Sequence, residues 1–301
     1  MDLALTILPI ALAIALGWAA RASGLVREQH WPGVEELSFK LLIPAILIHS
    51  IAGADLSLSR IGAFAVALVM TVAVGGAIAL SLRLVLAIPN ASLSTLYQTA
   101  IRFNGFISLA AAALLMGNTG LSLIAVAMAV LIPVVNVLNI IVLAVLCGGG
   151  ASPVRIVKTV VTNPLVIGGF IGIAVNQAGG LPHWADETLE IVGRAALAVG
   201  LLAVGAGIQL KRLMDFSFLV VLGLILRPLV VPALYVGIAW LLDLSSEETL
   251  AGILIFAVPA ASNGYIVAKA MGGDAPLYAD LLAWQTLLCL IAIPAYSVLV
   301  T

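Results

Sequence analysis

The sequence contains very little charge. Only 9% of its 301 residues are Asp, Glu, Lys or Arg, whereas 63% are hydrophobic, and its mean hydropathy is +1.24. Soluble domains carry about 25% charged residues, so this chain does not have enough charged side chains to cover a surface that faces water. The composition therefore excludes an ordinary soluble protein. It predicts a membrane protein whose helices face lipid or one another, with the lipid bilayer as a partner and no nucleic acid.

Residues that carry out chemistry are also scarce. The three His and two Cys residues show no spacing typical of metal ligands, so we expect neither a metal nor another cofactor. The sequence has no P-loop, no HExxH motif and no nucleophile elbow, and we therefore predict that the protein is not an enzyme. Apart from Asp280, near the start of the last apolar run, no acidic residue lies deep within such a run, so the usual signature of a proton or sodium pump is missing.

Long apolar runs dominate the sequence. A bilayer core requires about 20 apolar residues per helix. By this criterion we predict ten spans, at residues 3–21, 34–53, 61–87, 96–117, 120–146, 156–178, 187–209, 216–242, 248–271 and 276–300. The first run is interpreted as a transmembrane helix rather than a signal peptide, because no basic segment precedes it.

The positions of Lys and Arg predict the orientation of the chain. With the N-terminus outside, the outward-facing connections hold only Arg60. The inward-facing connections and helix ends then hold Arg21, Arg27, Arg83, Arg155, Lys158, Lys211, Arg212 and Lys269. Because Lys and Arg concentrate on the cytoplasmic side of membrane proteins, we expect both termini outside.

The two halves of the chain resemble each other. Residues of the first half are matched at a constant offset in the second, as in Pro9, Gly17 and Gly24 against Pro164, Gly172 and Gly179. A second set, Glu36, Lys40, Gly53 and Leu56, matches Glu190, Arg194, Gly207 and Leu210 in the same way. Each half, residues 1–147 and 156–301, contains five predicted spans, and an odd number gives the two copies opposite orientations. The predicted fold class is an all-α membrane protein with ten transmembrane helices in a 5+5 inverted repeat.

The fourth and ninth spans are interrupted by the same kind of motif. Asn104-Gly105-Phe106 lies in the fourth, and Asn263-Gly264-Tyr265 follows Pro259 in the ninth. Asn and Gly are poor helix formers, and Pro removes a backbone donor. Irregular backbone within a membrane must be buried in protein or line a watery cavity, and paired interruptions indicate a transporter's binding site. Helix N-termini formed there would attract a carboxylate. The alternative is a pair of kinks that neighbouring helices support.

Further polar residues lie within the spans. Asn136 and Asn139 either face the same cavity or bond to neighbouring helices, and Gln285 has the same two interpretations. Arg102 would attract an anionic substrate, and Arg227 would take the place of a bound cation between the interrupted helices. The alternative for both arginines is that they extend to the membrane interface.

Three features are interpreted as structural. His49 is expected to pair with a single partner rather than to titrate for function. Glu36 and Lys40, and likewise Glu190 and Arg194, are four residues apart. This spacing predicts a local ion pair that anchors the end of each helix.

The chain resembles the auxin efflux carrier family, which includes plant auxin carriers and bacterial permeases. The resemblance covers essentially the whole chain. Its motifs are Arg-Phe-Asn-Gly-Phe-Ile at 102–107, Pro133 with Asn136, Asn163-Pro164, Arg227 with Pro232, and Pro259 with Gly272-Gly273-Asp274. The sequence departs from the family in having no proline at the interruption of the fourth span, where Asn104-Gly105 must break the helix alone.

The resemblance implies a homodimer in which spans one, two, six and seven form a scaffold. Spans three to five and eight to ten would form a mobile transport domain, with spans four and nine crossing and an elevator-type mechanism. It also implies that Asn104, Asn136 and the Pro259–Asn263 segment line the substrate site, together with the neighbouring Gly105, Ser108, Ser262 and Gly264.

Our leading hypothesis is a secondary transporter, or permease, of a small organic anion in a bacterial inner (plasma) membrane. Two alternatives stay open. One is a sodium-coupled symporter of the bile acid type, and the other is a membrane receptor that binds a ligand without moving it.

Overall fold

The computed structural model describes residues 3–54, 58–148, 154, 157–158, 161–214 and 216–298, and the side chains of residues 3–6 and 58–61 lie outside that description. Every regular element in the described residues is a helix, which confirms the all-helical class. Within the described residues, five helical stretches are long and apolar enough to cross a membrane, namely Gly62–Leu84, Asn90–Cys147 (interrupted at residues 102–104), His183–Gly207, Phe218–Leu241 and Ala275–Val298. By helix composition the chain is a multi-pass membrane protein, and the ten-span inverted repeat stays a prediction.

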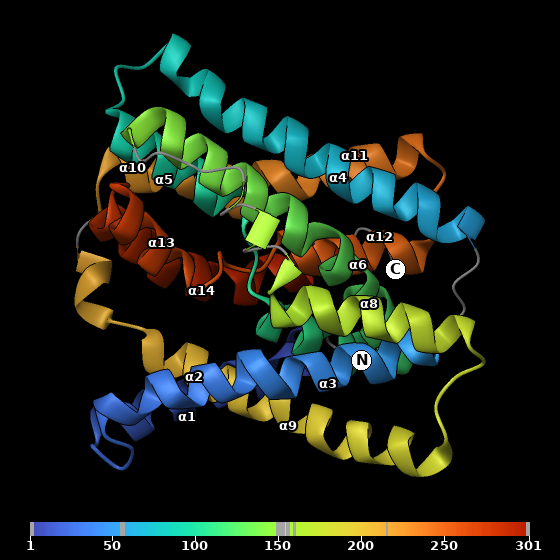
Figure 1. Cartoon of the computed structure of the whole chain (residues 1–301). Helices are drawn as coiled ribbons and strands as arrows, with labels where there is room; N and C mark the ends of the chain where they lie inside the picture. Colours follow the sequence, from blue (N-terminus) through green and yellow to red (C-terminus); the bar gives the residue numbers. More distant parts are fainter. Residues whose placement is uncertain are drawn as a thin grey trace. The chain divides into compact units, whose positions relative to one another are not determined.

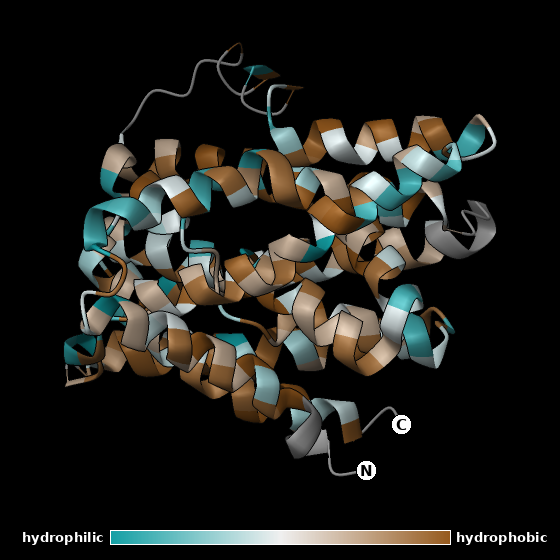
Figure 2. Cartoon of the chain, turned by 90° about the horizontal axis from the view of Figure 1, so that it is seen from below, coloured by the Kyte–Doolittle hydropathy of each residue, from teal (hydrophilic) through white to brown (hydrophobic). Residues whose placement is uncertain are grey.

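Figure 1 shows the helices along the chain. Their bounds are α1 Leu3–Ala22, α2 Trp31–Leu37, α3 Ile43–Ala52, α4 Leu58–Ser81, α5 Asn90–Ile101, α6 Gly105–Cys147, α8 Pro164–Gln177, α9 His183–Gly207, α10 Phe218–Leu224, α11 Val231–Leu241, α12 Ser246–Phe256, α13 Gly264–Met271 and α14 Ala275–Val298. Short turns of π-helix join α2 to α3 (η2, Ser38–Leu42) and α10 to α11 (η5, Ile225–Val230). Hydrophobic residues cover most of the helices, and hydrophilic residues gather mainly at helix ends (Figure 2).

The chain divides into two compact units. Unit 1 comprises Met1–Gly62, Gly105–Ile132 and Val161–Ile208, and it holds α1, α2, α3, α8 and α9. Unit 2 comprises Ala63–Asn104, Pro133–Val160 and Gln209–Thr301, and it holds α5, α10 to α14 and most of α4. In unit 1, α1 packs along α9, and α3 packs against both α8 and α9. In unit 2, α14 packs against α5, α10, α12 and α13, and α11 packs against α12.

The contact between α1 and α9 in unit 1 brings the two backbones together at glycines. A Cβ atom on Gly17 would lie 2.0 Å from the carbonyl oxygen of Leu202, and one on Gly205 would lie 1.9 Å from that of Ile14. Small residues allow such close approach between membrane helices. The helix pair is therefore held by mutual backbone contact, with one glycine contributed by each helix.

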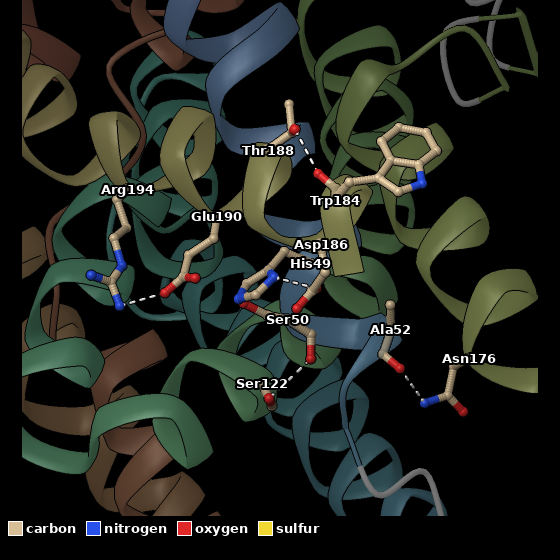
Figure 3. A network of polar contacts seen from close by, with 10 residues as sticks. All are labelled: His49, Ser50, Ala52, Ser122, Asn176, Trp184, Asp186, Thr188, Glu190 and Arg194. Atoms are coloured by element: carbon tan, nitrogen blue, oxygen red, sulfur yellow. Dashed lines mark hydrogen bonds and ion pairs between the residues drawn. The ribbon is translucent and has the colours of Figure 1, made fainter. Parts of the chain in front are cut away.

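Polar contacts in unit 1 join helices that are far apart in the sequence (Figure 3). The Nδ1 atom of His49 lies 2.7 Å from a carboxylate oxygen of Asp186, which confirms the prediction of a single partner for this histidine. The Asn176 amide donates to the carbonyl oxygens of Ile51, Ala52 and Ala54. Asn176 thus satisfies carbonyl groups that have no partner within α3, where that helix ends.

The two predicted ion pairs within helices are also present. Arg194 lies 2.5 Å from Glu190 on α9, and Lys40 pairs with Glu36. Both pairs are largely exposed, so each contributes little to stability. Three features used in the predictions lie outside the described residues. They are Arg155, the side chain of Arg60 and the connection over residues 149–153.

The turn between the predicted fourth and fifth spans lies at Gly117. We expected it at residues 118–120, but the helical path is broken at Gly117, where φ is 62° and ψ is −140°. Only glycine adopts this conformation without strain. We expect Gly117→Ala to lower the free energy of unfolding by about 1–3 kcal/mol, measured by thermal unfolding in detergent. The control Gly62→Ala, at a helical glycine with open space around it, should change stability far less.

Candidate functional site

Both predicted interruptions are present in the structure. Helix α5 ends at Ile101 and α6 begins at Gly105, and Arg102 between them is extended, with φ −73° and ψ 148°. Helix α12 ends at Phe256 and α13 begins at Gly264. The first interruption forms without a proline, between the end of α5 and Gly105.

The two interrupted segments contact each other within unit 2. The backbone N–H of Asn104 donates to the carbonyl oxygen of Pro259 at 2.9 Å. A guanidinium nitrogen of Arg102 lies 3.5 Å from the side-chain oxygen of Asn263. Residues that are about half the chain apart in sequence are therefore neighbours, and Asn104 is almost completely buried, with 2% of its surface exposed.

Arg227 lies where both segments end. Its side chain is fully buried, and it donates to the carbonyl oxygens of Val258 at 2.6 Å, Ile255 at 2.6 Å and Ala100 at 2.9 Å. The first two carbonyls belong to the end of α12 and the segment that follows it, and the third to the last turn of α5. One guanidinium thus satisfies carbonyl groups of both interrupted helices, whose last carbonyls have no partner within the helix.

Helix α14 supports the second interruption from the side. The Gln285 side-chain oxygen accepts a hydrogen bond from the backbone N–H of Ala260 at 3.0 Å, and the Tyr278 hydroxyl donates to the carbonyl oxygen of Ala261 at 2.7 Å. A Cβ atom on Gly264 would lie only 1.9 Å from that same hydroxyl. The glycine of the motif is therefore needed both to start α13 and to admit Tyr278.

Arg102 and Arg227 carry no compensating negative charge from the described part of the protein. Arg102 is 5% exposed and Arg227 is fully buried, and neither is within ion-pair distance of a described carboxylate. The two arginines differ in their hydrogen bonds, because Arg227 donates to three carbonyl oxygens. The Nε atom of Arg102 is buried without a hydrogen-bond partner, and the contact from its Nη1 atom to Asn263 is long, at 3.5 Å. Burial of a charge without a partner is costly, so Arg102 is the less well satisfied of the two buried arginines.

The start of α13 offers fewer backbone donors than the sequence suggested. The N–H groups of Gly264 and Tyr265 donate to the carbonyls of Ala261 and Ser262 in the preceding turn. The side chain of Asn263 makes no capping bond to α13 and is exposed. An anion at this end would therefore rely on side-chain donors and the helix dipole rather than on the first two backbone N–H groups.

The remaining predicted site residues are divided between the two compact units. Gly105 and the buried Ser108 belong to unit 1, while Pro259, Ser262 and Gly264 belong to unit 2. Asn136 is half-buried in unit 2, and its side chain makes no hydrogen bond within the described part of the chain. Asn139 donates to Val135 one turn earlier at 2.7 Å, so its amide bonds to its own helix instead of joining two helices.

Two residues at these interruptions were not predicted. Tyr278 is an aromatic residue in an apolar helix, and nothing in its sequence context distinguishes it from an ordinary core side chain. Gln98, on α5, is fully buried, and neither its oxygen nor its nitrogen has a partner. An amide inside an apolar run, one turn before Arg102, is a signal in the sequence that points to such a residue.

The fold and these interruptions define a multi-pass membrane protein with discontinuous helices. Residues 152–297 match the family model of a membrane transport protein. This match to the auxin efflux carrier family confirms the predicted resemblance over residues 152–297. A transporter family implies a protein that is not an enzyme. No curated protein matches the chain.

Proposed function

We propose that the protein is a secondary transporter of a small organic anion, a monocarboxylate or dicarboxylate, that works by elevator-type alternating access. The observation that carries this proposal is the buried Arg102, which has no described carboxylate partner. A buried cation is stabilised by an opposite charge at hydrogen-bond distance. Carboxylates match the planar guanidinium group well, and Arg102 has a buried donor that is not yet used.

The seat that we propose for the carboxylate is formed by Arg102, Asn263 and Asn104. Arg102 and Asn263 already lie within 3.5 Å of each other, and Asn104 is joined through its backbone to Pro259. On the resemblance to the family, we also propose Asn136, Ser262 and Gly264 of the same unit for this site, while Gly105 and Ser108 stay predictions from the resemblance.

The division of the chain supports the elevator part of the proposal. The helices of the predicted spans one, two, six and seven, α1 to α3, α8 and α9, belong to unit 1. The helices of spans three and eight to ten belong to unit 2, and residues 105–132 cluster with unit 1. We propose unit 1 as the scaffold and unit 2 as the moving part, in a homodimer with both termini outside the inner membrane.

The first test replaces the two asparagines of the interruptions. We expect Asn104→Ala and Asn263→Ala each to lower organic-anion counterflow in proteoliposomes by about tenfold or more, because a hydrogen bond to a charged group is worth about 1.5–3 kcal/mol. Asn118→Ala, at an exposed asparagine of α6, is the matched control and should transport like the wild type. Wild-type counterflow in both site variants would refute the assignment of the site.

The same preparation separates the other two hypotheses. A sodium-coupled symporter would lose uptake when choline replaces sodium. A receptor would show carboxylate binding, seen as a raised apparent unfolding temperature, but no flux into liposomes. Flux that persists without sodium would favour the carrier proposed here over both.

A further inference from the structure

We propose that Arg227 is a positioning residue that acts as a fixed internal cation for the two interrupted segments, so that transport needs no dissociable metal cation at this position. The inference rests on the proposed anion transport and adds how the site is held together. It concerns a residue that does not touch the substrate and acts through the backbone that carries Arg102 and Asn263.

The geometry is that of a closed coordination site. The Nε, Nη1 and Nη2 atoms of Arg227 each donate to a different carbonyl, of Val258, Ala100 and Ile255 respectively, at 2.6, 2.9 and 2.6 Å. The side chain is fully buried. Three donors directed in three directions from one planar group therefore connect the end of α5 with the end of α12 and the segment that follows it.

The positive charge of Arg227 is complementary to the negative C-terminal ends of α5 and α12. The last carbonyls of a helix have no partner within it, and the C-terminal end of its dipole is negative. Ala100 lies next to the last residue of α5, and Ile255 lies next to the last residue of α12. Two negative helix ends that meet inside a membrane need a cation between them, and carbonyl oxygens are ligands that metal cations use in such places.

The identity of this cation determines the coupling. A guanidinium is always charged at physiological pH, and here it is covalently part of the chain. It cannot dissociate with each transport cycle as a sodium ion does, so this position contributes no coupling ion. Arg102 differs because it has an unused donor, whereas the donors of Arg227 are committed to the backbone.

The test removes the internal cation and supplies it again from solution. We expect wild-type counterflow to be the same, within about twofold, in sodium, potassium and choline buffers, with roughly equal KM. Arg227→Ala should lower the maximal rate by about tenfold or more, as expected when buried carbonyls lose a charged donor. Methylguanidinium should restore part of this rate, and sodium should not. Arg227→Lys keeps the charge but not the three-point geometry, so it should have an intermediate rate.

A second readout does not depend on transport. Methylguanidinium should raise the apparent unfolding temperature of Arg227→Ala but not that of the wild type or of Arg83→Ala, a control at an exposed arginine of unit 2. Wild-type transport that requires sodium, or a sodium-dependent rise in the unfolding temperature of the wild type, would overturn the inference and leave anion transport intact. Absence of rescue in both assays would also overturn it. Absence of any anion flux in the wild type would instead contradict the proposed function, and the unfolding measurement would still decide the role of Arg227.

Discussion

The substitution Arg102→Gln should abolish stabilisation of the protein by carboxylates while leaving the ligand-free protein at least as stable as the wild type. Arg102 is 5% exposed, has no described ion-pair partner and keeps its Nε atom without an acceptor. Removal of such an uncompensated charge relieves a desolvation cost. A residue that had evolved for structure alone would behave in the opposite way, since its loss would lower stability.

The expected size of the effect follows from the hydrogen bonds involved. Charge-assisted hydrogen bonds contribute about 1.5–3 kcal/mol, so Arg102→Gln should weaken carboxylate binding by about 10- to 100-fold. Arg102→Lys should retain part of the affinity, because it keeps the charge but not the paired donors. The measurement is the shift of the unfolding temperature against carboxylate concentration, with Arg83→Ala as the control. An unchanged carboxylate shift in Arg102→Gln would show that the anion does not bind at this guanidinium.

Substitution of Arg227 should have the opposite effect on stability. Arg227→Met should lower the stability of the ligand-free protein, because three buried carbonyls lose their donor. The two arginines lie on interrupted or adjacent segments of the same unit, and their sequence contexts are similarly apolar. Opposite effects on stability would therefore show that Arg102 serves to bind a ligand, whereas Arg227 stabilises the backbone.

Features that depend on a few consecutive residues could be predicted from the sequence. Asn104-Gly105 and Pro259 with Asn263-Gly264 predicted the two interruptions, because poor helix formers act locally on the backbone. The ion pair of Glu190 with Arg194 followed from helical spacing alone. The all-helical class followed from composition and the length of the apolar runs.

Features that depend on residues far apart in the chain could not be predicted in the same way. The sequence indicated that Arg227 was unusual, but not that its partners would be Ala100, Ile255 and Val258. His49 was expected to have one partner, yet nothing pointed to Asp186, 137 positions away. Such pairs are set by how helices pack, and periodicity within one helix carries no information about them.

The close contact of α1 with α9 leads to the largest expected effect on stability. We expect Gly17→Val and Gly205→Val each to lower the free energy of unfolding by about 3 kcal/mol or more, because overpacking against rigid atoms costs about 1–3 kcal/mol and occasionally more. A Cβ atom at either position would lie within 2.0 Å of a backbone carbonyl oxygen of the other helix. Backbone atoms cannot move aside as a flexible side chain can, so the two helices would have to separate.

The same two helices provide a matched control. Gly207, two residues after Gly205 on α9, has nothing within 4 Å of an added Cβ atom, so Gly207→Ala should leave stability nearly unchanged. Reversible unfolding in mixed detergent, followed by circular dichroism, would give the three free energies. If Gly17→Val and Gly205→Val were as stable as the wild type, α1 and α9 would not be in backbone contact. Because the two glycines belong to one contact, the double variant should lose less than the sum of the two single losses.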